Sequence, residues 1–330
     1  MRNSFSKIRS VKKNVKEFVP KPRNIKDVFS EIEEYFDTSD TLVSVLMLVD
    51  EAASNEASAE VRNLFLSSAS NVRLQIAYFS TSKVAIDEKA DMAVIVACDT
   101  NVSTEIAEAC RNVGVPAYTV IDGKTAASTP SAFSSRMLYG DYCTLIADDT
   151  DSSKLMKNKL GSWIANVCVG KKFAFASAFT FVARPLATEI IHLTAIENAA
   201  VGFVPAIDAA DFPLMLLNQL KMLAQIAAVY GKKLDTTILK EAAGVLVGAI
   251  FGRKIFKVAN KIIPLPIFVV SGTVAFATTE AIGKALIAYF EAGGNIDGVV
   301  ALLKKTVTGS KVASNALKPV TSKVLKTVKA

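Results

Sequence analysis

Acidic residues follow several apolar runs in the first half of the chain, and these runs have the composition of β-strands. Asp50, Asp99 and Asp148 each come at or just after the end of such a run. Because the carboxyl ends of parallel strands meet at one edge of a sheet, we expect the three side chains to lie near one another. Carboxylate oxygens are the ligands that Mg²⁺ prefers. The favoured interpretation is that these acids cap helices and end strands, with a Mg²⁺ or nucleotide site as the alternative.

The motifs that hold phosphate in common nucleotide sites are missing from these positions. The segment after the first predicted strand is VDEAASNEASAEV, which has no glycine to bring backbone amides to a phosphate and no lysine for the outer phosphates. The segment TVIDGKT at residues 119–125 lacks the Asn-Lys pair that would recognise guanine. We therefore do not expect GTP hydrolysis by the usual machinery.

Histidine and cysteine are too few and too scattered for common metal or catalytic sites. His192 is the single histidine, and the four cysteines lack the C-x-x-C spacing of zinc sites (Cys98, Cys110, Cys143 and Cys168). Glu189 lies three residues before His192, which is compatible with a proton relay, but a packed or interfacial histidine is the favoured interpretation. The sequence thus predicts no catalytic residue, no metal site, no cofactor and a reducing compartment.

The acidic residues would be positioned by a domain in which strands alternate with helices. The segment 27–169 contains β-rich apolar runs at 42–49, 72–79, 90–98, 117–121 and 144–147. Helical spacing appears between several of them, at 58–67, 104–113 and 153–168. This alternation predicts an α/β domain with a mostly parallel sheet covered on both faces.

The segment 170–303 changes to long apolar helices, which predicts an all-α bundle or hairpin as the second domain. The helices are expected at 173–203, 211–230, 235–263 and 267–290. Residues 262–279 form an uncharged run at the threshold length for a membrane span, but Pro264 and Pro266 take up its start. A buried soluble bundle and a shallow interfacial hairpin both remain open.

Three glycines in this segment are four residues apart. Gly244, Gly248 and Gly252 would lie near one face of a helix and leave a groove without side chains. Each glycine costs a helix about 1 kcal/mol relative to alanine, so their alignment indicates close packing against another helix. We interpret the three glycines as a packing feature rather than a catalytic one.

Positive charge is concentrated at the two ends of the chain. Residues 1–26 hold nine Lys/Arg and one Glu, and residues 304–330 hold seven Lys and no acidic residue, so the remainder carries −8 against a net charge of +7. Phe5, Ile8, Val11, Val15 and Phe18 recur at helical spacing among the first basic residues. Two basic tails predict binding to a polyanion, either anionic lipid or nucleic acid. The alternative for the first tail is a disordered arm that only increases solubility.

The second half resembles a known bacterial family. The segments are VPAIDAADFPLMLLNQLKMLAQIAAVYG at 204–231, GRKIFKVANKIIP at 252–264 and SGTVAFATTEAIGKA at 271–285. Together they resemble the domain of unknown function of YcjF-type inner-membrane proteins, which is often fused behind Era-like GTPase domains. The resemblance covers about 184–303 and lends no activity. It marks seven residues of the helical domain (Pro205, Asp208, Gln219, Tyr230, Gly231, Arg253 and Pro264).

By this resemblance the segment 27–169 takes the place of a GTPase domain that lacks the phosphate-binding loop. We expect a non-enzymatic scaffold or adaptor on the cytoplasmic side of the inner membrane, since no secretory signal is present in the sequence. Its expected partners are an anionic membrane surface and a homo-oligomer or protein partner. The alternatives are a divergent nucleotide-binding or hydrolysing protein and a soluble cytoplasmic nucleic-acid binder, the latter disfavoured because the tails have few aromatic rings for base stacking.

Overall fold

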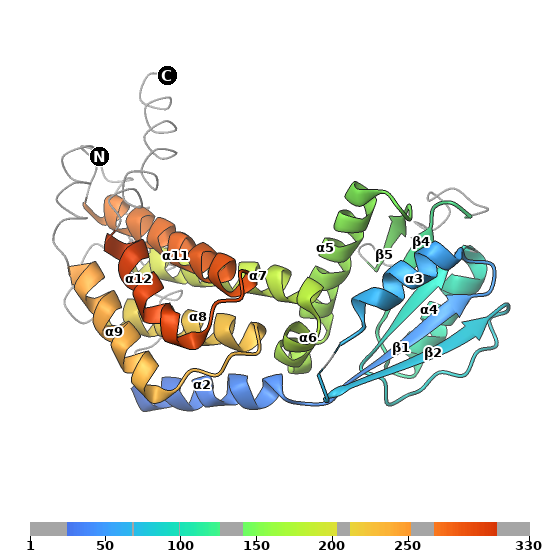
Figure 1. Ribbon diagram of the computed structural model, residues 1–330, viewed down its shortest axis with the longest axis horizontal. Helices are drawn as coiled ribbons and strands as arrows, with labels where there is room; N and C mark the ends of the chain where they lie inside the picture. Colours follow the sequence, from blue (N-terminus) through green and yellow to red (C-terminus); the bar gives the residue numbers. More distant parts are fainter. Residues whose placement is uncertain are drawn as a thin grey trace, which may run out of the picture. The chain divides into compact units, whose positions relative to one another are not determined.

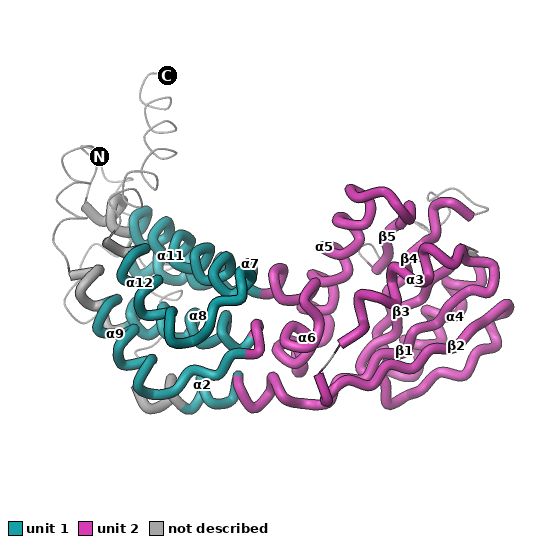
Figure 2. Tube along the Cα trace, viewed as in Figure 1, with its two compact units in different colours: residues 1–35, 187–228, 232–330 teal, residues 36–186, 229–231 magenta. Residues whose placement is uncertain are grey.

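The protein is described by a computed structural model that covers residues 25–67, 69–98, 100–125, 141–202, 212–251 and 267–308. Side chains are described at 30–67, 69–98, 101–125, 141–202, 214–246 and 272–306. The chain divides into two compact units, coloured separately in Figure 2. Unit 1 comprises 1–35, 187–228 and 232–330, and unit 2 comprises 36–186 and 229–231.

Unit 2 contains a five-stranded parallel sheet, which confirms the predicted α/β class (Figure 1). The strands are β1 (Val43–Asp50), β2 (Val72–Phe79), β3 (Met92–Ala97), β4 (Ala117–Asp122) and β5 (Tyr142–Leu145), in the order β2-β1-β3-β4-β5. β2 begins and ends as predicted. β5 lies two residues earlier than predicted, because Tyr142 already pairs with Thr119 of β4.

Helices pack on both faces of this sheet, as the continuous burial of β1, β3 and β4 requires. On one face, Ile106 and Cys110 of α4 (Thr100–Asn112) pack in a core with Leu48 and Ile95. On the opposite face, Trp163 of α5 (Thr150–Val167) contacts the ring of Tyr118, with centroids 5.2 Å apart. α3 (Asn55–Leu64) connects β1 to the segment before β2.

The long helix expected at 173–203 is interrupted. Residues 169–171 form a single 3-10 turn, η2 (Val169–Lys171), and α6 (Lys172–Ala178) ends before Phe179, whose φ of −126° and ψ of 109° are extended. α7 (Thr180–Gly202) then begins a new helix. The ring of Phe179 packs edge-on against that of Phe65 at 5.2 Å, so tertiary packing of an aromatic side chain accompanies the break.

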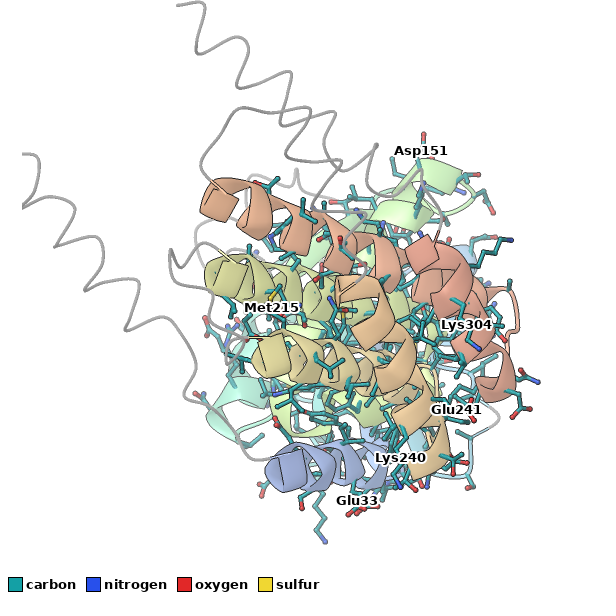
Figure 3. All side chains as sticks on the ribbon, turned by 90° about the vertical axis from the view of Figure 1, so that its left-hand side faces the viewer. Glu33, Asp151, Met215, Lys240, Glu241 and Lys304 are labelled. Carbon is teal, nitrogen blue, oxygen red and sulfur yellow. The ribbon has the colours of Figure 1, made fainter. Side chains whose placement is uncertain are left out.

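The elements described in unit 1 are all helices. They are α2 (Ile25–Ser39), most of α7, α8 (Phe212–Val229), α9 (Thr236–Phe251), α11 (Ile267–Glu291), the 3-10 turn η3 (Ile296–Gly298) and α12 (Val299–Thr308). α12 packs against α9 and α11. In Figure 3 charged side chains project from the outer sides of these helices, among them Glu33 of α2, Lys240 and Glu241 of α9, and Lys304 of α12.

A buried polar cluster joins three of these helices. The hydroxyl oxygen of Thr279 in α11 accepts hydrogen bonds from Asn198 Nδ2 of α7 at 3.0 Å and from Gln219 Nε2 of α8 at 2.6 Å. Asn218 Nδ2 donates to Asn198 Oδ1 at 3.0 Å. Asn218 and Gln219 thus bond across helices. Within the described residues, no helix is both long enough and apolar enough to span a membrane.

Candidate functional site at the carboxyl edge of the sheet

A cleft lies at the carboxyl ends of the parallel strands. Its volume is about 520 Å³, and it is lined by the ends of β1, β2 and β3, by α4 and by the segment after β4 (Asp50, Glu51, Ala52, Phe79, Ser80, Cys98, Val102 and Thr125). The chain places β2 on one side of β1 and β3 on the other, so the cleft is at the switch point of the strand order. Ligands of open α/β sheets bind at such points.

Asp50 is buried at the end of β1, and both of its oxygens accept hydrogen bonds. Oδ1 accepts from the backbone N–H of Ala52 at 3.0 Å. Oδ2 accepts from the backbone N–H of Cys98 at 3.2 Å and from its thiol, with a sulfur–oxygen distance of 3.4 Å. The carboxylate therefore links the end of β1 to the residue that follows β3, the strand next to it in the sheet.

The Cys98 thiol stays protonated near neutral pH. Burial, together with the nearby charge of Asp50, raises its pKa to about 11, although a hydrogen bond with Thr125 acts in the opposite direction. Because the thiolate is the nucleophilic form, Cys98 is a poor nucleophile in this setting. The thiol instead acts as a hydrogen-bond donor to Asp50.

Asp122 organises the wall beside the cleft. It ends β4, is fully buried, and accepts hydrogen bonds from the backbone N–H groups of Ser54 at 2.8 Å and Lys124 at 3.0 Å and from the hydroxyl of Thr125 at 2.7 Å. Burial opposes ionisation, but these bonds outweigh it and lower the pKa of Asp122. Ser54 in turn caps α3 by accepting from the Ala57 N–H. Asp122 thereby fixes Thr125 at the cleft.

The acidic residues that were expected to lie near one another have separate roles in the described part of the chain. Asp50 lines the cleft, whereas Asp148 is exposed, has a left-handed φ of 70° and pairs with Lys124 Nζ at 2.9 Å. Asp149 caps α5 through the backbone N–H groups of Asp151 and Ser152. Asp99 lies outside the described residues. In the described part of the chain, no three His, Cys, Asp or Glu side chains gather as metal ligands would.

The cleft has an acidic lining. Asp50 and Glu51 contribute carboxylates, and none of its lining residues is a Lys or Arg. This lining suits a cation or a hydrogen-bond donor better than a free polyphosphate. The sequence pointed to Asp50 through the acids at strand ends, but nothing in the spacing singled out Cys98 or Thr125, which join Asp50 only through the strand order.

His192 is exposed on α7 and belongs to no catalytic group in the described residues. Its Nδ1 lies 3.4 Å from Glu280 Oε1 of α11, and its ring packs edge-on against Phe276. Glu280 Oε2 also pairs with Lys284 Nζ at 2.7 Å. The sequence favours a packed or interfacial histidine; the side chain is exposed, contacts α11 at its ring, and has Glu280 rather than Glu189 as its partner.

The predicted glycine groove is described only at Gly244. This residue lies in α9, and a Cβ placed on it would have no described atom of another segment within 4 Å. Gly248 is in α9 without a described environment, and Gly252 lies outside the described residues. A close glycine contact does occur elsewhere in unit 1: a Cβ on Gly283 of α11 would lie 2.3 Å from Cγ1 of Ile191 in α7.

The residues marked by the family resemblance are described in part. Gln219 belongs to the buried polar cluster, while Tyr230 and Gly231 follow α8, where Gly231 adopts a φ of 64° that favours glycine. Four others lie outside the described residues (Pro205, Asp208, Arg253 and Pro264). No protein-family model matches the chain, and no curated protein matches it significantly.

Proposed function

We propose that this protein is a non-enzymatic, membrane-associated adaptor. Its basic segments, residues 1–26 and 304–330, bind an anionic lipid surface on the cytoplasmic side of a bacterial inner membrane. Its second half, an apolar helical domain of the YcjF type, lies at that surface and binds a protein partner or another copy. The α/β unit is a GTPase-like domain that lacks the phosphate-binding motifs.

The observation that carries this proposal is the segregation of charge. The two terminal segments together bear sixteen Lys/Arg and one acidic residue, while the net charge of the remaining chain is −8. Each Lys or Arg near an anionic bilayer contributes about 1 kcal/mol of binding, so clusters of this size suffice for attachment without a spanning helix. An acidic body would be repelled by the same surface, which favours attachment through the ends.

The helices of unit 1 support the second part of the proposal. α8 contains one charged residue, Lys221, which pairs with Glu31 of α2. In α11, Glu280 and Lys284 pair within one turn and so reduce the cost of placing both in an apolar setting. Apolar helices with few and paired charges are compatible with a position at a bilayer boundary or a partner surface.

Vesicle co-sedimentation tests the proposal with a matched pair of variants. Lys12→Gln/Lys13→Gln/Lys16→Gln removes three charges from the first basic segment. Lys83→Gln/Lys89→Gln/Lys154→Gln removes three from exposed positions of the α/β unit. We expect the first variant to bind vesicles of mixed neutral and anionic lipid about 100-fold more weakly than wild type, and the second to bind like wild type. Equal losses in both variants, or none in the first, would contradict the proposal.

Nucleotide binding is the second candidate function, and the cleft at the switch point favours it. Asp50 and Glu51 would act there by holding Mg²⁺ between the protein and a nucleotide. Saturable thermal stabilisation by GTP or ATP with Mg²⁺, lost in Asp50→Asn, would support this candidate over the adaptor. The absence of thermal stabilisation at millimolar nucleotide concentrations would rule out nucleotide binding as the function.

A further inference from the structure

The backbone groups on the outer side of β2 bond to no other strand among those described. β2 is the first strand in the sheet order, so only β1 pairs with it among the described strands. The N–H of Val43 donates to the carbonyl of Asn71, and the N–H of Glu51 donates to the carbonyl of Phe79. Since strand residues alternate, the odd-numbered residues of β2 face β1, and the N–H and C=O groups of 72, 74, 76 and 78 face outward. None of these outward groups bonds to another described residue.

The side chains of the same four residues are apolar and partly exposed. Ile76 is 40% exposed and Tyr78 is 62% exposed, and both lie on the sheet face that also carries Val45 and Met47. The loop 80–91 packs on the other face, where Val84 and Ile86 contact the core around Leu48. Considering the described residues alone, the outward edge of β2 and the side chains of Ile76 and Tyr78 are accessible together.

Natural edge strands usually carry features that prevent pairing with another strand, such as lysine, proline, a bulge or a short length. β2 has eight residues and contains neither lysine nor proline. Its one charged residue, Arg73, is held by an ion pair with Asp87. The opposite edge strand, β5, has only four residues. In its own length and sequence, β2 thus lacks the protection expected of an edge that remains unpaired.

We propose that two copies of this chain dimerise by pairing their β2 strands in antiparallel fashion, about a two-fold axis at Gln75. In this register Leu74 lies opposite the partner's Ile76, and Val72 lies opposite the partner's Tyr78. Each of these residues directs its N–H and C=O toward the partner, so every pair exchanges two backbone hydrogen bonds. The two five-stranded sheets become one continuous sheet.

The sequence of β2 suits a second copy of itself in this register. Centring the axis at Leu74 or Ile76 instead leaves three hydrogen-bonded pairs, whereas the axis at Gln75 gives four. The cross-strand pairs are aliphatic–aliphatic and aliphatic–aromatic, which stabilise antiparallel strands. On the other face Arg73 lies opposite the partner's Ala77, so no like charges oppose one another.

The test measures the mass of the full chain by light scattering after size exclusion, without lipid. The expected wild-type species has twice the 35.2 kDa mass of the chain. Ile76→Pro removes an N–H that bonds to nothing described within the monomer, and proline is tolerated at such edge positions. In the dimer the same change deletes a hydrogen bond and places a ring between the strands. We therefore expect Ile76→Pro to be a folded monomer.

A charge-based pair of variants provides the control. Ile76→Lys places an ammonium group on the proposed interface, and Leu155→Lys makes the same change at an exposed position of α5. We expect Ile76→Lys to be monomeric and Leu155→Lys to remain dimeric. Hydrogen exchange of the amides at 72, 74, 76 and 78 should slow as the wild-type concentration rises.

Three results would overturn the proposal. They are a wild-type monomer at concentrations up to about 100 μM, a dimer that persists in Ile76→Lys, and equal dissociation of the Ile76→Lys and Leu155→Lys variants. The inference rests on β2 alone, so its outcome does not depend on whether the chain binds lipid.

Discussion

The carboxylate of Asp122 connects two segments that are far apart in the sequence. It accepts from the N–H of Ser54, which begins α3, and from Lys124 and Thr125, which follow β4. A buried acceptor with three donors stabilises the ionised form, and loss of its charge leaves these donors poorly paired. The residue is therefore structural, although it lies beside the cleft.

We predict that Asp122→Asn lowers the free energy of unfolding by about 1–3 kcal/mol at neutral pH, measured by urea denaturation. The folded pKa lies below the ordinary value of 3.8, so the wild-type carboxylate contributes its full stability above that value. This contribution is lost as the pH falls through the folded pKa. The difference between variant and wild type should accordingly shrink in acid.

Asp148→Asn is the matched control for this prediction. Asp148 is exposed and pairs with Lys124, and asparagine tolerates its left-handed backbone. Its free energy of unfolding should change by about 0.5 kcal/mol or less. A similar loss in both variants, or a pH-independent loss in Asp122→Asn, would argue against the assigned role.

At the scale of elements, glycine has different consequences in two helices of unit 1. Gly283 of α11 leaves no room for a Cβ because Ile191 of α7, which is buried, lies against it. Gly244 of α9 has no described neighbour at that distance. Sequence spacing drew attention to the second glycine, whereas the close helix contact is made by the first.

We predict opposite effects of the same substitution at these positions. Gly283→Ala should lower the free energy of unfolding by about 1–3 kcal/mol, because the added methyl group overpacks the α7–α11 contact. Gly244→Ala should raise it by up to about 1 kcal/mol, because alanine favours the helix. Thermal unfolding followed by circular dichroism provides the measurement. Destabilisation by Gly244→Ala would instead support the packing groove predicted from the glycine spacing.

At the scale of the whole molecule, the separation of charge between ends and body sets the expected response to salt. Screening shortens the Debye length from about 8 Å at 0.15 M to about 3 Å at 1 M ionic strength. If the basic segments are the main attachment, 1 M NaCl should release the chain from anionic vesicles. The bound fraction after sedimentation measures this release.

Extraction by other agents separates this attachment from an apolar one. If the chain stays on the membrane through 1 M salt and alkaline carbonate but is released by detergent, the apolar helices rather than the basic segments hold it there. Complete release by salt would leave the helices free to bind a protein partner or a second copy.

The sequence identified most elements because their signals are local. The apolar run at 72–79 is bounded by polar residues and became β2 without a shift, and the helix predicted at 267–290 extends one residue further in α11. The sequence did not predict the helix break at Phe179. The extended backbone there accompanies a ring contact with Phe65, which is more than a hundred residues away in the chain. Periodicity within a window carries no information on such a contact.

By itself the sequence determined the α/β class, the apolar character of the second half and the basic ends, since these follow from composition and short-range spacing. Only the tertiary structure decided that β1 lies between β2 and β3. That order brings Asp50, Cys98 and Thr125 to one cleft and leaves the apolar β2 at an edge. Strand order depends on which distant segments bury their surfaces together, and many orders are compatible with the same local pattern.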